Sequence, residues 1–274
     1  MGRMVNQTKL TTTKLIQDNL ITKEDLIEHL KSIGIQKGMV LYVQSSLEYF
    51  SYICGGNRTL VEALQEVVGY DGCIVTNAFS YKNTDPLDRD IDRFKPYQIE
   101  IVRDAMPSFS KKLTPSNNKL ANQMMRHEGV YRSNHPIHSF IAWGKYAKLI
   151  CDKQPLHFSL SKDSPLGKLC ELNGFVLLLG IKYEGADIFK VGRVNDRDTP
   201  IRIVSSPIER RGKKSFINML EYDYNYKNTM EIQQMLKERQ IVKETFIGRA
   251  RCRLFNAKEA LTLSSGYFHT HTSE

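Results

Sequence analysis

The most apolar run in the chain is Phe175-Val176-Leu177-Leu178-Leu179-Gly180. A short run of this kind, preceded by the turn signal Asn173-Gly174, is typical of a strand that is buried on both faces. Ahead of it, Ser164 and Pro165 predict the start of a helix, with Ser164 as the N-cap and Pro165 in the first turn. The segment that leaves the strand, residues 181–193, is therefore the first place to look for chemistry, because ligands in such sheets bind beyond the carboxyl ends of the strands.

A strand–helix–strand unit lies nearer the N-terminus. Residues 39–43 and 73–76 are short, apolar and β-prone, and residues 59–68 repeat apolar side chains at helical spacing. The short links between them imply a right-handed crossover between two parallel strands. The polar residues at the ends of these strands are Gln44, Ser45, Ser46 and Asn77.

The remaining elements complete an α/β pattern. Capping and periodicity predict helices over residues 22–33, 98–106, 120–127, 145–150 and 230–239, and strands over residues 201–205, 215–223, 242–247 and 250–255. We expect an α/β fold: a single domain, residues 21–268, with a central mixed, partly parallel sheet flanked by helices. Residues 1–20 and 269–274 are expected to be flexible segments.

A second stretch concentrates polar chemistry around a proline: Tyr131-Arg132-Ser133-Asn134-His135-Pro136-Ile137-His138-Ser139-Phe140-Ile141-Ala142-Trp143-Gly144. Pro136 pushes His135 into an extended conformation, while Ile137, Phe140 and Ile141 are apolar enough to anchor the stretch in a core. A polar site on the rim of a buried element is one interpretation. An ordinary loop, followed by a helix capped by Ser139, is the other.

The composition is that of an ordinary globular protein. Of the 274 residues, 41% are hydrophobic and 25% are charged, and no apolar run is long enough to predict a membrane-spanning helix. The first residues lack the apolar core of a signal peptide. The five cysteines are scattered and form no Cys-x-x-Cys pair, which favours reduced thiols and a cytoplasmic location.

The net charge of +9 suggests an anionic partner. Its cations are not gathered on one helix or tail, so we expect no nucleic acid as the partner. A polyanionic cofactor such as coenzyme A also suits a basic surface, which would attract it through electrostatic steering. A solvated basic surface without a partner is the remaining alternative. His269 and His271 have no evident third ligand, so no metal site is expected.

Several stretches, taken in order, resemble the aminoglycoside N(3)-acetyltransferase family. Val43-Gln44-Ser45-Ser46-Leu47 is similar to the family's Val-His-Ser-Ser-Leu, and Gly55-Gly56 falls where the family has two glycines before a helix. Arg132 to Phe140 resembles its Arg-Ser-x-His-Pro-x-x-Ser-Phe, and residues 164–180 resemble its Ser-Pro-Leu to Leu-Leu-Leu-Gly segment. The similarity spans about residues 20–268, and the ordered series is more specific than any one piece.

The resemblance implies an N-acetyltransferase that moves an acetyl group from acetyl-coenzyme A to an amine of an aminoglycoside or a related amino sugar. Small-molecule amines are then the expected partners, without a membrane; the sequence indicates no oligomeric state, and a role in antibiotic resistance does not follow from resemblance alone. The resemblance assigns the coenzyme A pocket to Ser45, Ser46, Arg132, Ser133, His135 and Ser139. Gly55, Gly56 and Phe140 are expected to bind the cofactor with them.

The sequence departs from the family where the catalytic element is expected. The family reads approximately Asn-Thr-x-x-His-x-x-Glu after its long central strand, with the histidine as base. This chain has Lys190 in place of the histidine and Arg193 in place of the glutamate, and the histidine of Val-His-Ser-Ser is Gln44. Both cations make the local field more positive, and neighbouring like charges disfavour each other.

Three interpretations stay open at this stage. The chain is an acyltransferase that uses His135 or His138 as base and Asp187 as orienting carboxylate, with Lys190 as the alternative base. It is a catalytically degenerate relative that keeps the coenzyme A fold. Or it acylates something other than an antibiotic, for which positioning alone supplies much of the rate.

Overall fold

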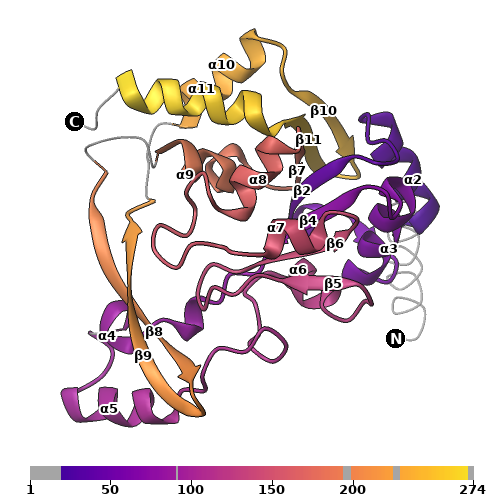
Figure 1. The fold of residues 1–274 in the computed structure, drawn as a ribbon. Coiled ribbons are helices and arrows are strands. Elements are labelled where there is room, and N and C mark those ends of the chain that lie inside the picture. Colours follow the sequence, from indigo (N-terminus) through magenta and orange to yellow (C-terminus); the bar gives the residue numbers. More distant parts are fainter. Residues whose placement is uncertain (1–19, 91, 194–198, 225–228, 271–274) are drawn as a thin grey trace, which may run out of the picture.

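A seven-stranded mixed sheet forms the centre of the computed structural model (Figure 1), which describes residues 20–90, 92–193, 199–224 and 229–270. In spatial order its strands are β10 (Lys243–Ile247), β11 (Ala250–Asn256), β7 (Phe175–Leu179), β2 (Val40–Ser45), β4 (Cys73–Asn77), β6 (Phe140–Gly144) and β5 (Val130–Arg132). The expected α/β fold with a mixed central sheet is confirmed.

The three central strands are parallel, and the predicted parallel pair, β2 with β4, is confirmed. β2 pairs with β4 on one side, where Tyr42 opposes Val75, and with β7 on the other, where Tyr42 opposes Val176. The outer strands run antiparallel to their neighbours: β6 against β4, β5 against β6, β11 against β7 and β10 against β11. The parallel strands therefore end at one edge of the sheet, where their polar terminal residues meet.

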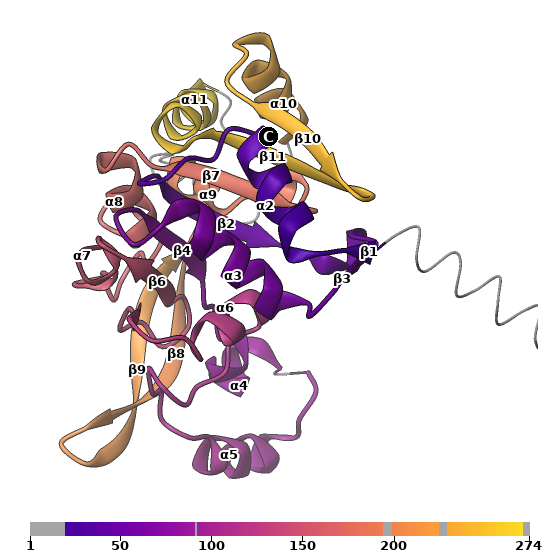
Figure 2. The same cartoon turned by 90° about the vertical axis from the view of Figure 1, so that its right-hand side faces the viewer.

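Helices cover both faces of the sheet, because successive side chains on each strand point to opposite sides. Tyr42 packs with the helices of one face and Leu41 with those of the other. The first face carries α7 (Ala147–Cys151), α8 (Pro165–Glu171), α9 (Asp187–Arg193), α10 (Thr229–Glu238) and α11 (Ala257–Thr270). The second carries α2 (Lys23–Ser32), α3 (Asn57–Val68) and α6 (Lys119–Met124), which Figure 2 shows on the side of the sheet facing the viewer.

Both predicted N-cap residues lie at the starts of helices, but only one of them makes the capping hydrogen bond. Thr22 caps α2 in a capping box: its hydroxyl accepts from the Asp25 amide at 3.2 Å, and Asp25 accepts from the Thr22 amide at 2.8 Å. Ser164 does occupy the N-cap position of α8. However, its buried hydroxyl makes no hydrogen bond within the part of the chain that the structure describes.

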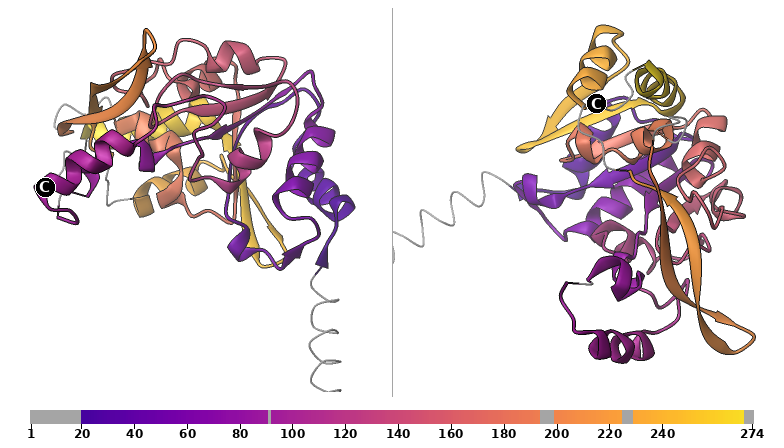
Figure 3. Two further views of the ribbon diagram at one scale, coloured as in Figure 1. Left: turned by 90° about the horizontal axis from the view of Figure 1, so that it is seen from below. Right: turned by 90° about the vertical axis from the view of Figure 1, so that its left-hand side faces the viewer.

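A long hairpin stands apart from the main sheet (Figure 3). Its strands β8 (Ile201–Arg210) and β9 (Lys213–Tyr222) pair along their whole length, and α4 (Pro86–Arg89) and α5 (Pro96–Ala105) lie beside it. The Asp88 carboxylate accepts from the Ser205 amide at 2.6 Å, and the Arg103 guanidinium lies 4.5 Å from the Phe216 ring centroid. We call this hairpin with α4 and α5 the arm.

Sequence reasoning missed some elements. No helix was predicted after residue 255, but α11 runs to Thr270 and buries Leu263 and Tyr267. A two-residue parallel pair, β1 (Leu20–Ile21) with β3 (Tyr52–Ile53), was also missed. Residues 1–19 and 271–274 lie outside the described residues, so the flexibility expected at the termini stays a prediction, and His271 falls there too. Among the described residues, no helix could span a membrane and no cluster of metal-ligating side chains occurs.

Candidate active site

A cleft of about 400 Å³ opens at the carboxyl ends of the parallel strands. It receives Gln44, Ser45 and Ser46 from the end of β2, and Asn77 from the end of β4. This is where the strand order predicts a ligand site. The other lining residues are Leu47, Glu48, Asn57, Phe79, Tyr81, Asn117, Asn118, Lys119, Ile181, Gly185, Asp187 and Lys190.

Gly180 lets β7 leave the sheet close to β2. Its φ of +66° lies in the left-handed region, and a Cβ there would come within 2.7 Å of the Ser46 carbonyl oxygen. In the same corner the Ser46 amide donates to the Leu179 carbonyl at 2.9 Å. The segment after β7 therefore turns back over the strand end and brings α9 into the cleft.

Asp187, the first residue of α9, organises the floor of the cleft. The residue is only 2% exposed. One carboxylate oxygen accepts from the Tyr42 hydroxyl and the Asn77 amide, both at 2.6 Å, and the other accepts from the Lys190 ammonium at 2.6 Å. Burial, and then the Asp187 charge, raise the pKa of Tyr42 well above its ordinary value, so the phenol stays protonated and donates.

Gln44 holds the start of α9 against β2. Its side-chain oxygen accepts from the Asp187 amide at 3.0 Å, and its side-chain nitrogen donates to the Gly185 carbonyl at 2.8 Å. This residue stands where the family resemblance expects a histidine. In this chain the Gln44 side chain links β2 to the start of α9, and both of its polar atoms are used in these hydrogen bonds.

Lys190, like Lys119, is a cation that lines the cleft. It lies one turn after Asp187 on α9, and its ammonium is 5.8 Å from the centroid of the Phe79 ring. Asp187 was predicted to orient a histidine. In the structure its carboxylate holds Lys190, because i and i+3 residues of a helix are neighbours. A carboxylate at this distance favours the charged form of the lysine.

His135 is fully buried, and both of its ring nitrogens are engaged. Nδ1 accepts from the amides of Ile137 at 3.2 Å and His138 at 2.8 Å. That arrangement assigns the proton to Nε2, which lies 3.2 Å from the Leu156 carbonyl. Burial, reinforced by the nearby His138, lowers the pKa of His135 to about 3. The geometry favours a structural role for this histidine over the role of a base.

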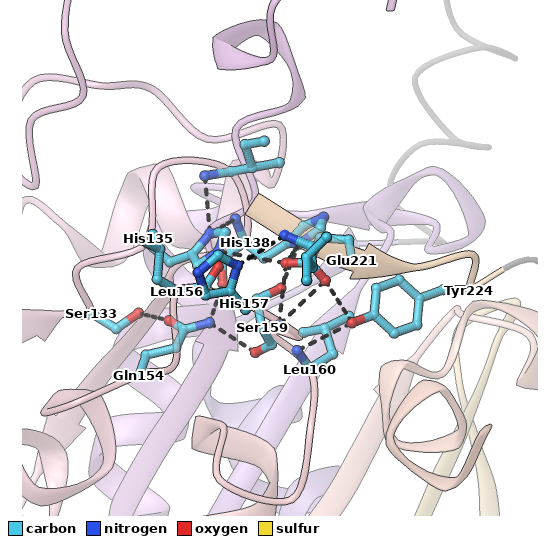
Figure 4. A network of polar contacts seen from close by, with 12 residues as sticks. Ser133, His135, His138, Gln154, Leu156, His157, Ser159, Leu160, Glu221 and Tyr224 are labelled. Atoms are coloured by element: carbon cyan, nitrogen blue, oxygen red, sulfur yellow. Dashed lines mark hydrogen bonds and ion pairs between the residues drawn. The ribbon is translucent and has the colours of Figure 1, made fainter. Parts of the chain in front are cut away.

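His138 belongs to the polar network that Figure 4 shows from close by, and it packs against two aromatic residues that line the cleft. Its Nδ1 is 2.7 Å from the Ser159 hydroxyl, and its ring meets the edges of Phe79 and Tyr81 at centroid distances of 5.0 and 5.9 Å. The residue is 6% exposed and does not line the cleft. A role as base, predicted from the sequence, would require the histidine to reach past these two rings.

The carboxylate beside the two histidines is Glu221 of β9, which sequence reasoning missed. One of its oxygens lies 3.6 Å from His135 Nε2 and 3.6 Å from His138 Nδ1, and the other accepts from the Tyr224 hydroxyl at 2.7 Å. Burial opposes the charge of Glu221, but hydrogen bonds and the histidines prevail and lower its pKa to about 2. Nothing in the local sequence of a strand end signals a partner more than eighty residues away.

The residues predicted to hold coenzyme A fall into two groups. Ser45 and Ser46 line the cleft, and Gly55 and Gly56, with φ of +82° and +62°, lead into α3, whose first residue, Asn57, lines it as well. This group places hydroxyls and the positive end of a 12-residue helix at one end of the cleft.

The second group lies inside the protein, so its predicted contact with the cofactor has no support in the geometry. The Arg132 guanidinium donates to Ser139 Oγ at 3.0 Å and to the carbonyl of Ala78 at 3.2 Å, among other acceptors. Burial lowers the pKa of Arg132 to about 10. Ser133 Oγ accepts from the Phe140 amide at 2.7 Å. Arg132, Ser133, Ser139 and Phe140 are all buried and none lines the cleft.

Other lining residues were not singled out from the sequence. Asn118 caps α6, accepting from the Leu120 amide at 2.9 Å, and donates to Asn77 Oδ1 at 2.6 Å. An asparagine just ahead of a predicted helix is a capping signal that could have marked this position. Tyr42 carries no such signal, because it lies within an otherwise apolar strand.

The fold and the cleft together define a class of protein: a three-layer α/β protein with a cleft where its parallel strands end, which is the usual place of a ligand site in such folds. Residues 42–269 match the aminoglycoside 3-N-acetyltransferase family. The chain belongs to this family, a family of acyltransferases, so the expected class of enzyme is confirmed.

Individual relatives agree with this assignment. The SPbeta prophage-derived aminoglycoside N(3')-acetyltransferase-like protein YokD of Bacillus subtilis (strain 168) is 31% identical over 256 residues, which are 92% of this chain and 94% of YokD. The crystal structure of YokD superposes with a TM-score of 0.85, covering 92% of this chain and 95% of that one.

Two further solved structures share the fold. The aminoglycoside acetyltransferase AAC(3)-Xa is 25% identical, with a TM-score of 0.86 over 96% of this chain and 98% of that one. AAC-IIIb, solved as a binary complex with CoASH, is 20% identical, with a TM-score of 0.80 over 93% of this chain and 99% of that one.

Proposed function

We propose that the protein transfers an acetyl group from acetyl-coenzyme A to an amine of an aminoglycoside or a related amino sugar. The observation that carries the proposal is the Asp187–Lys190 pair, which opens into the cleft at the position where the family resemblance places the catalytic element. AAC-IIIb, a relative in fold, has been solved with CoASH. The degenerate alternative finds no support in the comparisons.

The residues at one end of the cleft fit the co-substrate. Ser45 and Ser46 offer hydroxyls to the pantetheine chain, and the amides at the start of α3 suit a phosphate. When bound, acetyl-coenzyme A supplies the thioester. A nucleotide end near α3 would leave the reactive end of the co-substrate toward Gly185 and Lys190, which line the same cleft.

Lys190 then acts as a proton carrier. Held by Asp187, its ammonium stabilises negative charge on the thioester carbonyl oxygen as the acceptor amine attacks the carbonyl carbon. The C–S bond breaks, Lys190 gives a proton to the departing sulfur, and the neutral lysine takes a proton from the acylated nitrogen. The products are an amide and a free thiol, and Lys190 ends as it began.

The test has two parts, both done on the full chain. Calorimetry should detect coenzyme A binding, and a thiol reagent should report free coenzyme A when acetyl-coenzyme A is mixed with a panel of aminoglycosides and amino sugars. Binding without thiol release for every acceptor would contradict acetyl transfer and return the protein to the degenerate interpretation. An absence of binding at millimolar coenzyme A would contradict the assignment of the cleft itself.

A further inference from the structure

Two lysines and two carboxylates of the described residues line the cleft: Lys119, Lys190, Glu48 and Asp187. The Lys190 ammonium donates to the Asp187 carboxylate at 2.6 Å. Lys119 is exposed, and within the part of the chain that the structure describes no hydrogen bond or salt bridge joins its ammonium to another residue. Lys119 is therefore the lining cation that remains available to an anionic group of a ligand.

The backbone that carries Lys119 is fixed by hydrogen bonds to the end of β4 and the segment after it. The Asn118 side chain donates to Asn77 Oδ1 at 2.6 Å. The Asn118 amide donates to Ser116 Oγ at 3.0 Å, and that hydroxyl donates to the Phe79 carbonyl at 3.2 Å. The place of the lysine along the cleft is thus set before a ligand binds, which lowers the cost of ordering it.

Lys119 also lies near the helix start to which the proposed function gives a phosphate. Asn57 and Lys119 are the first residues of α3 and α6, and both line the cleft. The two helices pack against each other on one face of the sheet (Figure 2). Arg58, the cation on the first turn of α3, is paired with Glu62 at 2.8 Å and does not line the cleft. The positive charge at this part of the cleft therefore comes from Lys119.

Arg132, the cation that the resemblance assigns to the cofactor pocket, is used elsewhere. It is buried, and its guanidinium donates to the carbonyls of Ala78 at 3.2 Å and Thr114 at 2.5 Å. Coenzyme A carries a diphosphate directly after the pantetheine chain and a 3′-phosphate farther on, on the ribose. A lysine ammonium binds phosphate as a point charge, and the group that follows the pantetheine chain is the one a lining residue meets first.

Resting on the proposed function, we propose that Lys119 binds the diphosphate of coenzyme A and so makes the cleft prefer a nucleotide-linked thioester to a pantetheine thioester. Ser45 and Ser46 hold the pantetheine chain in this arrangement, and Lys119 holds the anionic group that follows it. Lys119 is a binding residue here and takes no part in the proton transfers, which belong to Lys190.

Calorimetry with coenzyme A, 3′-dephospho-coenzyme A and pantetheine tests the inference. Lys119→Gln should weaken the binding of both nucleotides about tenfold, the size expected for one charge-assisted hydrogen bond, and should leave pantetheine binding unchanged. An unchanged affinity for coenzyme A, or an equal loss for pantetheine, would overturn the inference. A loss for coenzyme A without one for 3′-dephospho-coenzyme A would move Lys119 to the 3′-phosphate and overturn the diphosphate assignment.

A second lysine provides the matched control. Lys112 is exposed, lies a few residues earlier in the chain and does not line the cleft. Lys112→Gln removes the same charge and should leave the affinity for coenzyme A unchanged, whereas Lys119→Arg, which keeps the charge, should stay within a few-fold of the wild type. If Lys112→Gln weakens binding as much as Lys119→Gln, net charge alone explains the effect and the inference is wrong.

The thiol assay separates the inference from the proposed function. With an acceptor that gives thiol release, Lys119→Gln should raise the KM for acetyl-coenzyme A about tenfold and leave kcat unchanged, because it removes binding that is equal in the ground state and the transition state. A fall in kcat at saturating acetyl-coenzyme A would contradict a pure binding role. If no acceptor gives thiol release, acetyl transfer fails as the function, and the calorimetric comparison still decides the role of Lys119.

Discussion

Asp187 and Glu221 are both buried carboxylates that hold basic side chains, yet only Asp187 reaches the cleft. Asp187 holds a lysine that lines the cleft, so the pair can act on a ligand. Glu221 grips two histidines whose rings are enclosed by aromatic and backbone groups, so its network joins β9 to the body of the protein. Histidine is the usual base at neutral pH, but here access to the cleft, more than residue type, separates the two sites.

The largest effect is expected from the pair in the cleft. Lys190→Met should lower kcat/KM for acetyl transfer by about 10²–10³-fold, because one stabilising donor for the oxyanion is lost together with the proton carrier. Thiol release at saturating acetyl-coenzyme A measures it. Lys182→Met, an exposed lysine on the segment before α9, is the control and should retain activity. An unchanged rate in Lys190→Met would move the chemistry to another residue.

The enclosed network of Glu221, His135 and His138 should instead make the free energy of unfolding depend on pH. The pKa of His135 is about 3 in the folded protein, against about 6.5 for an unperturbed histidine. Since the folded state resists protonation, the stabilisation is complete above about pH 6.5 and is lost as the pH falls toward 3. At pH 5 the contribution of His135 to the free energy of unfolding is lower by about 2 kcal/mol.

Urea unfolding at pH 7, 6 and 5 measures that loss. The His135→Asn variant should lose less free energy of unfolding than the wild type over this range, whereas His127→Asn, at a half-buried histidine outside the network, should follow the wild type. Parallel pH profiles for wild type and His135→Asn would refute the structural role of this group.

A smaller effect is expected where the strand end meets α9. Gln44→Leu leaves the Asp187 amide and the Gly185 carbonyl without their side-chain partners, which should lower the free energy of unfolding by about 1–2 kcal/mol. The exposed Gln36→Leu serves as control. If Gln44→Leu is as stable as the wild type, the link between β2 and α9 adds nothing to the site.

The smallest effect concerns the co-substrate. Ser46→Ala should weaken coenzyme A binding by about 1 kcal/mol, roughly fivefold, the typical net value of one hydrogen bond. Calorimetry with coenzyme A measures the change in affinity. The reference variant is Ser32→Ala, which removes a hydroxyl that donates to the His29 carbonyl in α2 and is remote in sequence from Ser46. Identical affinities for Ser46→Ala and the wild type would place the pantetheine chain elsewhere.

The sequence predicted the fold much better than the site. Residues 175–180 and the strand–helix–strand unit carry their burial in their composition, so the parallel core and the location of the cleft were predictable. Arg132 illustrates what was not: a buried guanidinium that satisfies internal carbonyls has the same local sequence as one that binds a phosphate. Asp187 was identified, but its partner was not, because three-dimensional packing decides which neighbour a carboxylate holds. The roles of Glu221 and Tyr42 could be recognised only from the tertiary fold.

A crystal structure with coenzyme A tests the central claim most directly. The account predicts that the pantetheine chain passes Ser46 and that the sulfur lies in the cleft within reach of the Lys190 ammonium. A sulfur placed beside His138, or a coenzyme A molecule bound outside the cleft, would contradict it.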